Sequence, residues 1–510
     1  MTVIQIVPPD LAERIAANLP TALAALGAYV IVFLVITFLA RRDYDSSLGD
    51  YVVASRGLGW LVASLTLVAT VLSGVGMAGF PGTVYSVGIP FITTIIIGYA
   101  VTAPAIWYLG RRMWVLGEEY DFNTPGDLLG DYYQSDTVRV YTVIASVAFN
   151  TTYVVAQLLA GGIVLTVLTG GVIPFNVSMI LVAVVVILHV TGTGMKGIAY
   201  LDTFNGALIA FLVGVFAVSI ASSAGGVAEI FTSLGEAQAD FTVVPGITGL
   251  FTPEVIILFG IFVTLGNSLI APAAWVRMYA LDSERSFARV AGTLISVFTL
   301  LYVFGTVLIG IYGRTALPSV GNPDAVSSLL AFEVMPFVLA ALFLVGILAA
   351  VVSTTDSYTH VMAATISRDF IRAIVAPEID ETTELRVNKF VMGATMVVAL
   401  IGAFFYPGLI TPLALIVGGI AVQLLSPLIG AVAWPRASAE AAIAAPAVGT
   451  VLLLLFQVQA IPNPFPTPLV PGLVTASIAN LVLFMAISYL TKPQPIAKIE
   501  QYHGVIDERL

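Results

Sequence analysis

The feature that most constrains this chain is a long series of apolar stretches separated by short polar connectors. Each stretch is about 20 residues long, the length that an α-helix needs to cross the ~30 Å hydrocarbon core of a bilayer. Hydrophobic residues make up 59% of the sequence and charged residues only 10%, a balance that soluble globular domains do not have. We therefore expect an all-α polytopic membrane protein embedded in a lipid bilayer.

Counting the apolar stretches predicts about thirteen transmembrane helices. The expected helices cover residues 21–40, 60–85, 90–109, 140–168, 174–190, 198–220, 253–280, 287–312, 335–365, 390–405, 409–434, 441–456 and 469–490. The longest polar connectors, 223–252 and 369–387, are too short to form a second domain. We expect a single transmembrane domain over residues 1–510.

Lysine and arginine placement predicts how the chain lies in the membrane, because positively charged loops stay in the cytoplasm. With the N-terminus outside and the C-terminus inside, all 20 of these residues except Arg14 and Arg314 fall in cytoplasmic segments. This orientation agrees with an odd number of helices. The acidic, lysine-poor composition is compatible with a multi-pass protein of a prokaryotic plasma membrane.

Several classes of function are excluded by composition and motifs. The chain has no cysteine, so disulfides, thiolate metal sites and cysteine nucleophiles are ruled out. Its net charge of −10 argues against a nucleic-acid partner, which demands a basic surface. No catalytic triad, nucleotide-binding loop or enzymatic metal motif is present, and nothing indicates an obligate protein partner. We do not expect an enzyme.

Two of the expected helices contain small and polar residues that interrupt a regular helix, at 73–82 and at 264–272. Each begins a run of five helices, 59–222 and 252–434, and two runs of five enter the membrane in opposite directions. We therefore expect a 5+5 inverted-repeat core, preceded by an extra helix at 21–40 and followed by two helices within 438–491. Unwound segments at mid-membrane expose carbonyls to a cation and helix N-termini to a substrate. The alternative is that the glycines only allow close helix packing.

A cluster of hydroxyls and one carboxylate, Ser353-Thr354-Thr355-Asp356-Ser357, lies inside the apolar run 337–366. Polar groups at this depth are costly unless they bind something. Neutral hydroxyls and carbonyls suit a sodium ion, a hard cation that must also be able to leave. The alternative is that Ser353 and Thr354 bond to the preceding turn of their own helix. Within this cluster we favour sodium.

The chain resembles the sodium:solute symporter family, which has the inverted-repeat fold of the leucine transporter. The resemblance runs over about residues 50–434 and depends on the order and spacing of several short motifs. These are 50–56, Gly79-Phe80-Pro81-Gly82 with Tyr85 and Gly88, Gln157 with Gly161-Gly162, Gly194-Met195-Lys196 with Asp202, Pro272 with Arg277, and Ser353-Thr354 with Asp356-Ser357. One departure is Ile270-Ala271-Pro272-Ala273, where several relatives carry Gly-Gln-Pro-His, so we expect a different set of polar groups to read the substrate.

The resemblance implies a sodium site with backbone and side-chain ligands. Its ligands would be the carbonyls of Ala69, Leu72 and Ala350 and the hydroxyls of Ser353 and Thr354. Asp202 would lie on the sodium release path, against the alternative of a solvated acid at a helix end near Lys196. Asp356 would tune the ion site or pair with an arginine.

Substrate contacts are expected where the broken helices face a cavity. The candidates are Ser73, Gly74, Tyr153, Gln157, Thr264, Asn267, Ser268 and Pro272. Tyr153 and Gln157 are four residues apart and share a helix face, and Gln157 could equally join two helices. We see no buried arginine or lysine to bind an anion, and we assign Arg277 to a charged cytoplasmic loop. A substrate carboxylate would then be held by backbone amides of 73–76.

These patterns predict a sodium-coupled secondary active symporter that imports a small-molecule organic solute by alternating access. A carboxylate or amino acid is favoured over a sugar, and Na+ is the expected coupling ion. Two alternatives stay open: a proton-coupled transporter on the same fold, and a sensor derived from a transporter. The intact hydroxyl pair argues against proton coupling, and the short segment 491–510 argues against a signalling domain.

Overall fold

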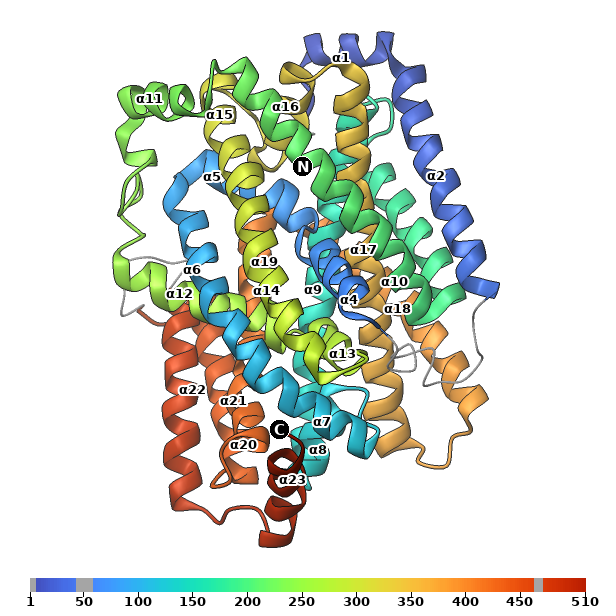
Figure 1. Cartoon of the computed structure of the whole chain (residues 1–510), viewed down its shortest axis with the longest axis vertical. Helices are drawn as coiled ribbons and strands as arrows, with labels where there is room; N and C mark the ends of the chain where they lie inside the picture. The colour runs from blue at the N-terminus through green and yellow to red at the C-terminus, as the bar shows by residue number, and fades with distance from the viewer. Residues whose placement is uncertain (1–5, 43–57, 463–470) are drawn as a thin grey trace.

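A computed structural model describes residues 6–42, 58–462 and 471–510 of the chain. This part is built from helices, and its one isolated pairing of extended backbone joins Leu58 to Leu281. Figure 1 shows the helices as one tall bundle, with α8 and α5 near opposite ends. The all-helical architecture predicted from the apolar stretches is confirmed. The motif at residues 50–56 lies outside the described residues.

Eleven of the described helices carry most of the apolar stretches. They are α2 (Leu19–Arg42), α6 (Ile89–Ala105), α9 (Asp136–Leu168), α10 (Phe175–Ser223), α12 (Pro253–Leu265), α14 (Glu284–Leu301), α17 (Phe337–Ala364), α18 (Glu381–Phe405), α19 (Ile410–Ala421), α21 (Ala439–Gln457) and α22 (Pro471–Leu490). The other helices of the described ranges are α1 (Pro9–Ala17), α4 (Trp60–Val71), α5 (Phe80–Val87), α7 (Arg111–Tyr120), α8 (Pro125–Tyr132), α11 (Val227–Gln238), α13 (Pro272–Tyr279), α15 (Leu308–Ala316), α16 (Val326–Val334), α20 (Leu425–Val432) and α23 (Ile496–Arg509).

Short π and 3-10 segments join several of these helices. They are η2 (Val75–Gly79), η3 (Ile106–Gly110), η4 (Ala239–Phe241), η5 (Gly266–Ile270), η6 (Tyr302–Val307), η7 (Pro323–Ala325), η8 (Thr365–Val375) and η9 (Val422–Leu424). Five of them, η2, η3, η5, η6 and η8, are π-helical. Single π turns inside α-helices frequently mark functional sites.

Eleven helices in the described ranges are long and apolar enough to cross a membrane, against the thirteen expected. Two local features account for the difference. The stretch 60–85 is broken into α4, η2 and α5, which are each too short to be counted. The stretches 174–190 and 198–220 both lie in α10, in which two helical segments meet at a kink at Gly194, whose backbone is not helical (φ 59°, ψ −162°), so the two are counted together as one helix. The exact number of spans, the 5+5 repeat and the orientation stay predictions.

The two predicted helix interruptions are present in the structure. Helix α4 ends at Val71, and the chain continues through Leu72 and Ser73 before η2 begins at Val75. Helix α12 runs into η5, and Ala271 then leaves the helical region (φ −49°, ψ 129°) before Pro272 starts α13. Proline at the first position favours a new helix, because its missing N–H would have no partner there.

Helices α9 and α17 form the centre of the bundle, with their apolar windows largely buried, whereas α2 and α18 expose most of theirs. Both central helices pack closely on the break that follows α4. A Cβ atom at Gly74 would lie 2.5 Å from the Cβ of Ala160 and 2.8 Å from Val351. The alternative given to the glycines, close packing, therefore holds at Gly74. The same close approach brings the broken helix beside the polar cluster of α17.

Candidate functional site

The polar cluster of α17 lies against the end of α4. Ser353 and Thr354 are fully buried. The Thr354 hydroxyl lies 2.9 Å from the Ala350 carbonyl, one turn earlier in its own helix, and 3.5 Å from the Ala69 carbonyl of α4. The last four carbonyls of a helix have no partner further along it, and Ala69 is one of these. Neutral oxygens from two helices therefore come together at this point.

The expected sodium ligands have the right chemistry for that ion. Ala69, Leu72 and Ala350 are buried like the two hydroxyls, so an ion here would be shielded from water. Their carbonyls and the hydroxyls are neutral oxygen donors, which bind a hard cation reversibly. The contact of Thr354 with the Ala350 carbonyl is also the ordinary bond of a threonine in a helix. The assignment of these five residues to sodium stays a prediction.

Asp202 of α10 is fully buried beside this cluster. Its carboxylate accepts a hydrogen bond from the Ser353 hydroxyl through one oxygen. Its other oxygen lies 3.1 Å from Nη2 of Arg277 in α13. The alternative of a solvated helix-end acid is therefore wrong. Asp202 joins the serine of the expected sodium site to a buried arginine.

Arg277 itself is only 2% exposed, which corrects its assignment to a charged cytoplasmic loop and the expectation that no buried cation is available. Its guanidinium also donates to the Ser357 hydroxyl of α17 at 2.5 Å and to the Ala273 carbonyl at 3.2 Å. Arginine keeps its charge at all relevant pH values, so a buried arginine needs such partners. The pair with Asp202 supplies the opposite charge.

Asp356 has a different partner from the arginine that was considered. Its carboxylate lies 2.7 Å from Nδ1 of His189 in α10, and both side chains are fully buried. The His189 ring packs on Phe33 of α2, with ring centroids 5.0 Å apart. This contact joins helix α2, at the edge of the bundle, to His189 and through it to the polar cluster of α17.

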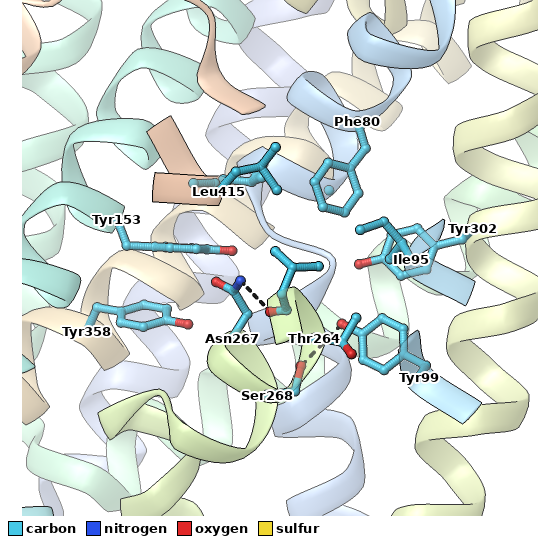
Figure 2. A pocket seen from close by; sticks show the side chains of 14 residues that line it. Phe80, Ile95, Tyr99, Tyr153, Thr264, Asn267, Ser268, Tyr302, Tyr358 and Leu415 are labelled. Carbon is cyan, nitrogen blue, oxygen red and sulfur yellow. Dashed lines mark hydrogen bonds between the residues drawn. The ribbon is translucent and has the colours of Figure 1, made fainter. Parts of the chain in front are cut away.

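A partly enclosed cavity, lined by residues of η2 and η5, lies between the two helix breaks. Figure 2 shows Tyr153 and Tyr358 on one side and Tyr99 and Tyr302 on the other, with their hydroxyl ends directed inward. Asn267 lies between them. Phe80 and Leu415 cover one end of the space in this view. Within the described part of the chain, the lining residues are uncharged.

The polar atoms of this pocket are partly engaged already. Asn267 donates from Nδ2 to the Val263 carbonyl at 2.8 Å, and its Oδ1 atom finds no partner among the described residues. The Ser268 hydroxyl donates to the Tyr99 hydroxyl at 3.3 Å. A free amide oxygen and several phenol hydroxyls can accept and donate hydrogen bonds at once. The pocket thus suits a small solute with hydroxyl, amide or carboxylate groups and an apolar part.

The structure separates the expected substrate residues into two groups. Tyr153, Thr264, Asn267 and Ser268 line the pocket, whereas Ser73, Gly74, Gln157 and Pro272 are not among its lining residues. Gln157 accepts a hydrogen bond from the Gly74 amide at 2.8 Å. That amide is therefore already occupied and is not free to hold a carboxylate.

Sequence reasoning missed three of the pocket tyrosines, Tyr99, Tyr302 and Tyr358. Tyr358 had a detectable signal, because it follows Thr354 by four residues and so shares its helix face. Arg277 also had one, because it lies inside the apolar stretch 253–280 and charges there are rare unless they function. Tyr99 and Tyr302 belong to helices far apart in sequence, and no local pattern joins them.

The sequence of this chain matches the family model described as "Sodium:solute symporter family" over residues 51–449. That range is well over half of the chain. The chain belongs to the sodium:solute symporter family. The expected resemblance is confirmed, and members of this family are transporters, so the chain is a transporter and not an enzyme.

Characterised relatives of this symporter differ in what they carry. The sodium/pantothenate symporter of Escherichia coli (strain K12) is 27% identical, with 90% of this chain and 95% of that protein covered. The sodium/proline symporter of the same organism is 24% identical, with 73% and 74% covered. The relatives therefore indicate sodium-coupled import of a small solute and leave the substrate open.

Solved structures show the same fold. A Na+-coupled sialic acid symporter in a substrate-bound outward-open state matches this symporter with a TM-score of 0.77 at 17% identity, covering 93% of this chain and 98% of that one. The nucleobase-cation-symport-1 family transporter Mhp1, in a closed conformation, matches with a TM-score of 0.54 at 16% identity, covering 89% and 98%. At such identities the comparison speaks for the fold alone.

Proposed function

We propose that this symporter uses the sodium gradient to import a small organic carboxylate or amino acid by alternating access across a prokaryotic plasma membrane. The observation that carries the proposal is the meeting of Ala69 and Thr354, where the end of a broken helix contacts the hydroxyl cluster of α17. Family membership supplies sodium as the coupling ion, and this contact offers it a buried set of neutral oxygens.

Sodium would be held by the carbonyls of Ala69, Leu72 and Ala350 and by the hydroxyls of Ser353 and Thr354. An ion at this site would have ligands from both α4 and α17. It would therefore stabilise the conformation in which these two helices lie together. A ligand shifts a conformational equilibrium only through its different affinity for the two states. We propose that Asp202, which already contacts Ser353, receives the ion as it leaves.

The substrate would occupy the tyrosine-lined pocket beside the break in α4. The pocket adjoins the proposed sodium ligands along the chain, because Val75 and Gly76 line it and Leu72 lies three residues earlier. Pantothenate and proline are the natural first probes, since the relatives named for them are sodium symporters and both molecules are carboxylates. The 5+5 repeat, with two runs of five helices at 59–222 and 252–434, is part of the same proposal.

A first test removes the two hydroxyls. In proteoliposomes with an inward sodium gradient, Ser353→Ala combined with Thr354→Ala should abolish sodium-stimulated uptake, because two of five ligands are lost. We expect a fall of about 100-fold or more in the sodium-dependent rate, measured with radiolabelled pantothenate and proline. Thr359→Ala, also fully buried in α17, is the matched control and should retain most of the activity.

Two results would contradict the proposal. Unchanged sodium dependence in the double variant would remove Ser353 and Thr354 from the ion site. Uptake by the unmodified protein that follows a pH gradient and ignores sodium would establish the proton-coupled alternative.

A further inference from the structure

A second, smaller cavity lies beside the central pocket. Ser268, in the middle of η5, lines both spaces. The second cavity lies among α4, η3, α13 and α14, and Arg277 is its charged lining residue in the described part of the chain. In the predicted orientation this side faces the cytoplasm. A solute that moves from the pocket toward the cytoplasm past Ser268 thus meets a buried guanidinium.

The guanidinium of Arg277 is only partly used by the protein. Nη2 contacts Asp202 and Ser357, and Nη1 donates to the Ala273 carbonyl. Its Nε atom is buried without a hydrogen-bond partner among the residues described. Arginine presents its N–H groups in a rigid fork that matches a carboxylate with two parallel hydrogen bonds. The unused Nε–H therefore leaves one hydrogen-bond donor for a second carboxylate beside that of Asp202.

The positions of these groups separate two tasks of substrate recognition. The lining of the central pocket has hydroxyls and an amide but no charged side chain. It can therefore hydrogen-bond to the polar groups of a solute and contact its apolar part, but it has no partner for a charge. The neighbouring cavity has the charge but few other polar groups. A carboxylate solute would therefore find its strongest single partner only after it starts to leave the pocket.

We propose that Arg277 and Ser268 form a second binding site for the substrate carboxylate on the cytoplasmic exit path, and that Asp202 competes with the substrate for Arg277. The inference rests on the proposed function, because it requires a carboxylate substrate. Its consequence is specific: the bond between Arg277 and Asp202 weakens substrate binding at this site. Neutralising Asp202 should therefore tighten carboxylate binding.

This expected gain separates the proposal from a structural role of the ion pair. If the pair only holds α10 and α13 together, removing either charge leaves the other buried and unpaired, which is destabilising. Both single changes would then weaken binding. In the proposal the two charges act in opposite directions, because only Arg277 attracts the substrate.

The test measures binding to the purified full-length protein with sodium replaced by potassium, so that sodium-dependent binding does not contribute. The probes are pantothenate and its uncharged alcohol analogue pantothenol, which differ at the carboxylate. Asp202→Asn should lower the apparent Kd for pantothenate about tenfold and change that for pantothenol less than about twofold. Adding Arg277→Gln in the Asp202→Asn background should cancel the gain, and Arg314→Gln, on the opposite side, should change neither Kd.

The double variant carries neutral amide side chains at both positions, which can still hydrogen-bond to each other, and monodispersity with an unchanged helical circular dichroism spectrum confirms that it is folded. Weaker pantothenate binding in Asp202→Asn, or equal changes for both probes, would overturn the inference even if sodium-stimulated uptake of pantothenate is intact. Sodium-stimulated uptake of a neutral sugar, with no binding of pantothenate or proline by any variant, would overturn the inference together with the carboxylate class in the proposed function.

Discussion

The two ends of the bundle are closed by different chemistry. Toward the end that the predicted orientation places outside, α5, η7 and α19 meet in what we call the outer seam, formed by Thr83, Asp324, Ile410 and Thr411. The Ile410 amide donates to the Asp324 carboxylate at 2.9 Å, and the Thr83 and Thr411 hydroxyls lie 2.8 Å apart. This seam therefore has one buried acid and no partner of opposite charge among its four residues.

Toward the other end α8, α9 and η8 meet in an inner seam, formed by Asp127, Arg139, Arg368 and Asp369. Nε of Arg368 donates to Asp127 at 2.8 Å. Arg139 lies 3.6 Å from Asp127 and 3.9 Å from Asp369. The inner seam is thus a network of opposite charges, whereas the outer seam depends on hydrogen bonds. We expect opening of the inner seam to cost more free energy.

The largest effect should follow from removing Asp127, the acid shared by two arginines. Asp127→Ala leaves Asp369 as the remaining acid of the seam for Arg139 and Arg368. Because these side chains are partly exposed, the cost is below that of a fully buried pair, and with two arginines affected it should be about 2 to 3 kcal/mol. The protein should therefore unfold at a lower temperature, measured by thermal denaturation in detergent. Asp136→Ala, at the start of α9, removes an acid of the same helical region that is exposed. If the melting temperatures of both variants fall by the same small amount, the charge network does not stabilise the inner seam.

The second effect concerns pH at the outer seam. Burial raises the pKa of Asp324 from its ordinary value of 3.8 to about 7, and the Ile410 amide only partly offsets this. The closed seam therefore binds a proton more tightly than a hydrated, open one. The contribution of Asp324 to the stability of the closed seam is greatest below about pH 4 and falls as the pH rises toward 7. We expect a loss of about 2 kcal/mol, a value lowered to allow for residual hydration of the buried acid.

Asp324→Asn tests this sign directly, because it keeps the oxygen that accepts from Ile410 and removes the titration. Its melting temperature should depend less on pH between about 5 and 8 than that of the unmodified protein. Asp10→Asn replaces an exposed acid and should leave the pH profile unchanged. A profile of Asp324→Asn that matches the unmodified protein would mean that another group titrates in this range.

The two seams also show where sequence reasoning succeeds. The helices and both interruptions were predictable, because apolar length and helix-breaking residues act locally. The inner seam joins Asp127 to Arg368, which are 241 residues apart, and no local pattern reveals such a pair. Arg277 was misplaced for a related reason: a charge near the end of an apolar stretch looks solvated until its distant partner, Asp202, is known.

The smallest effect should come from the hydroxyl pair of the outer seam. Thr83→Val keeps the shape of the side chain and removes its hydrogen bond to Thr411, which should shift the closed seam toward opening by about 1 kcal/mol, or about fivefold. The chain has no cysteine, so Leu415→Cys, in the pocket wall, gives a single site for a membrane-impermeant maleimide. Labelling from outside should be about fivefold faster in the Thr83→Val background. Thr93→Val, whose hydroxyl bonds only within α6 among the contacts described, should not accelerate it. Equal labelling in both backgrounds would show that the outer seam is closed by packing and not by this hydrogen bond.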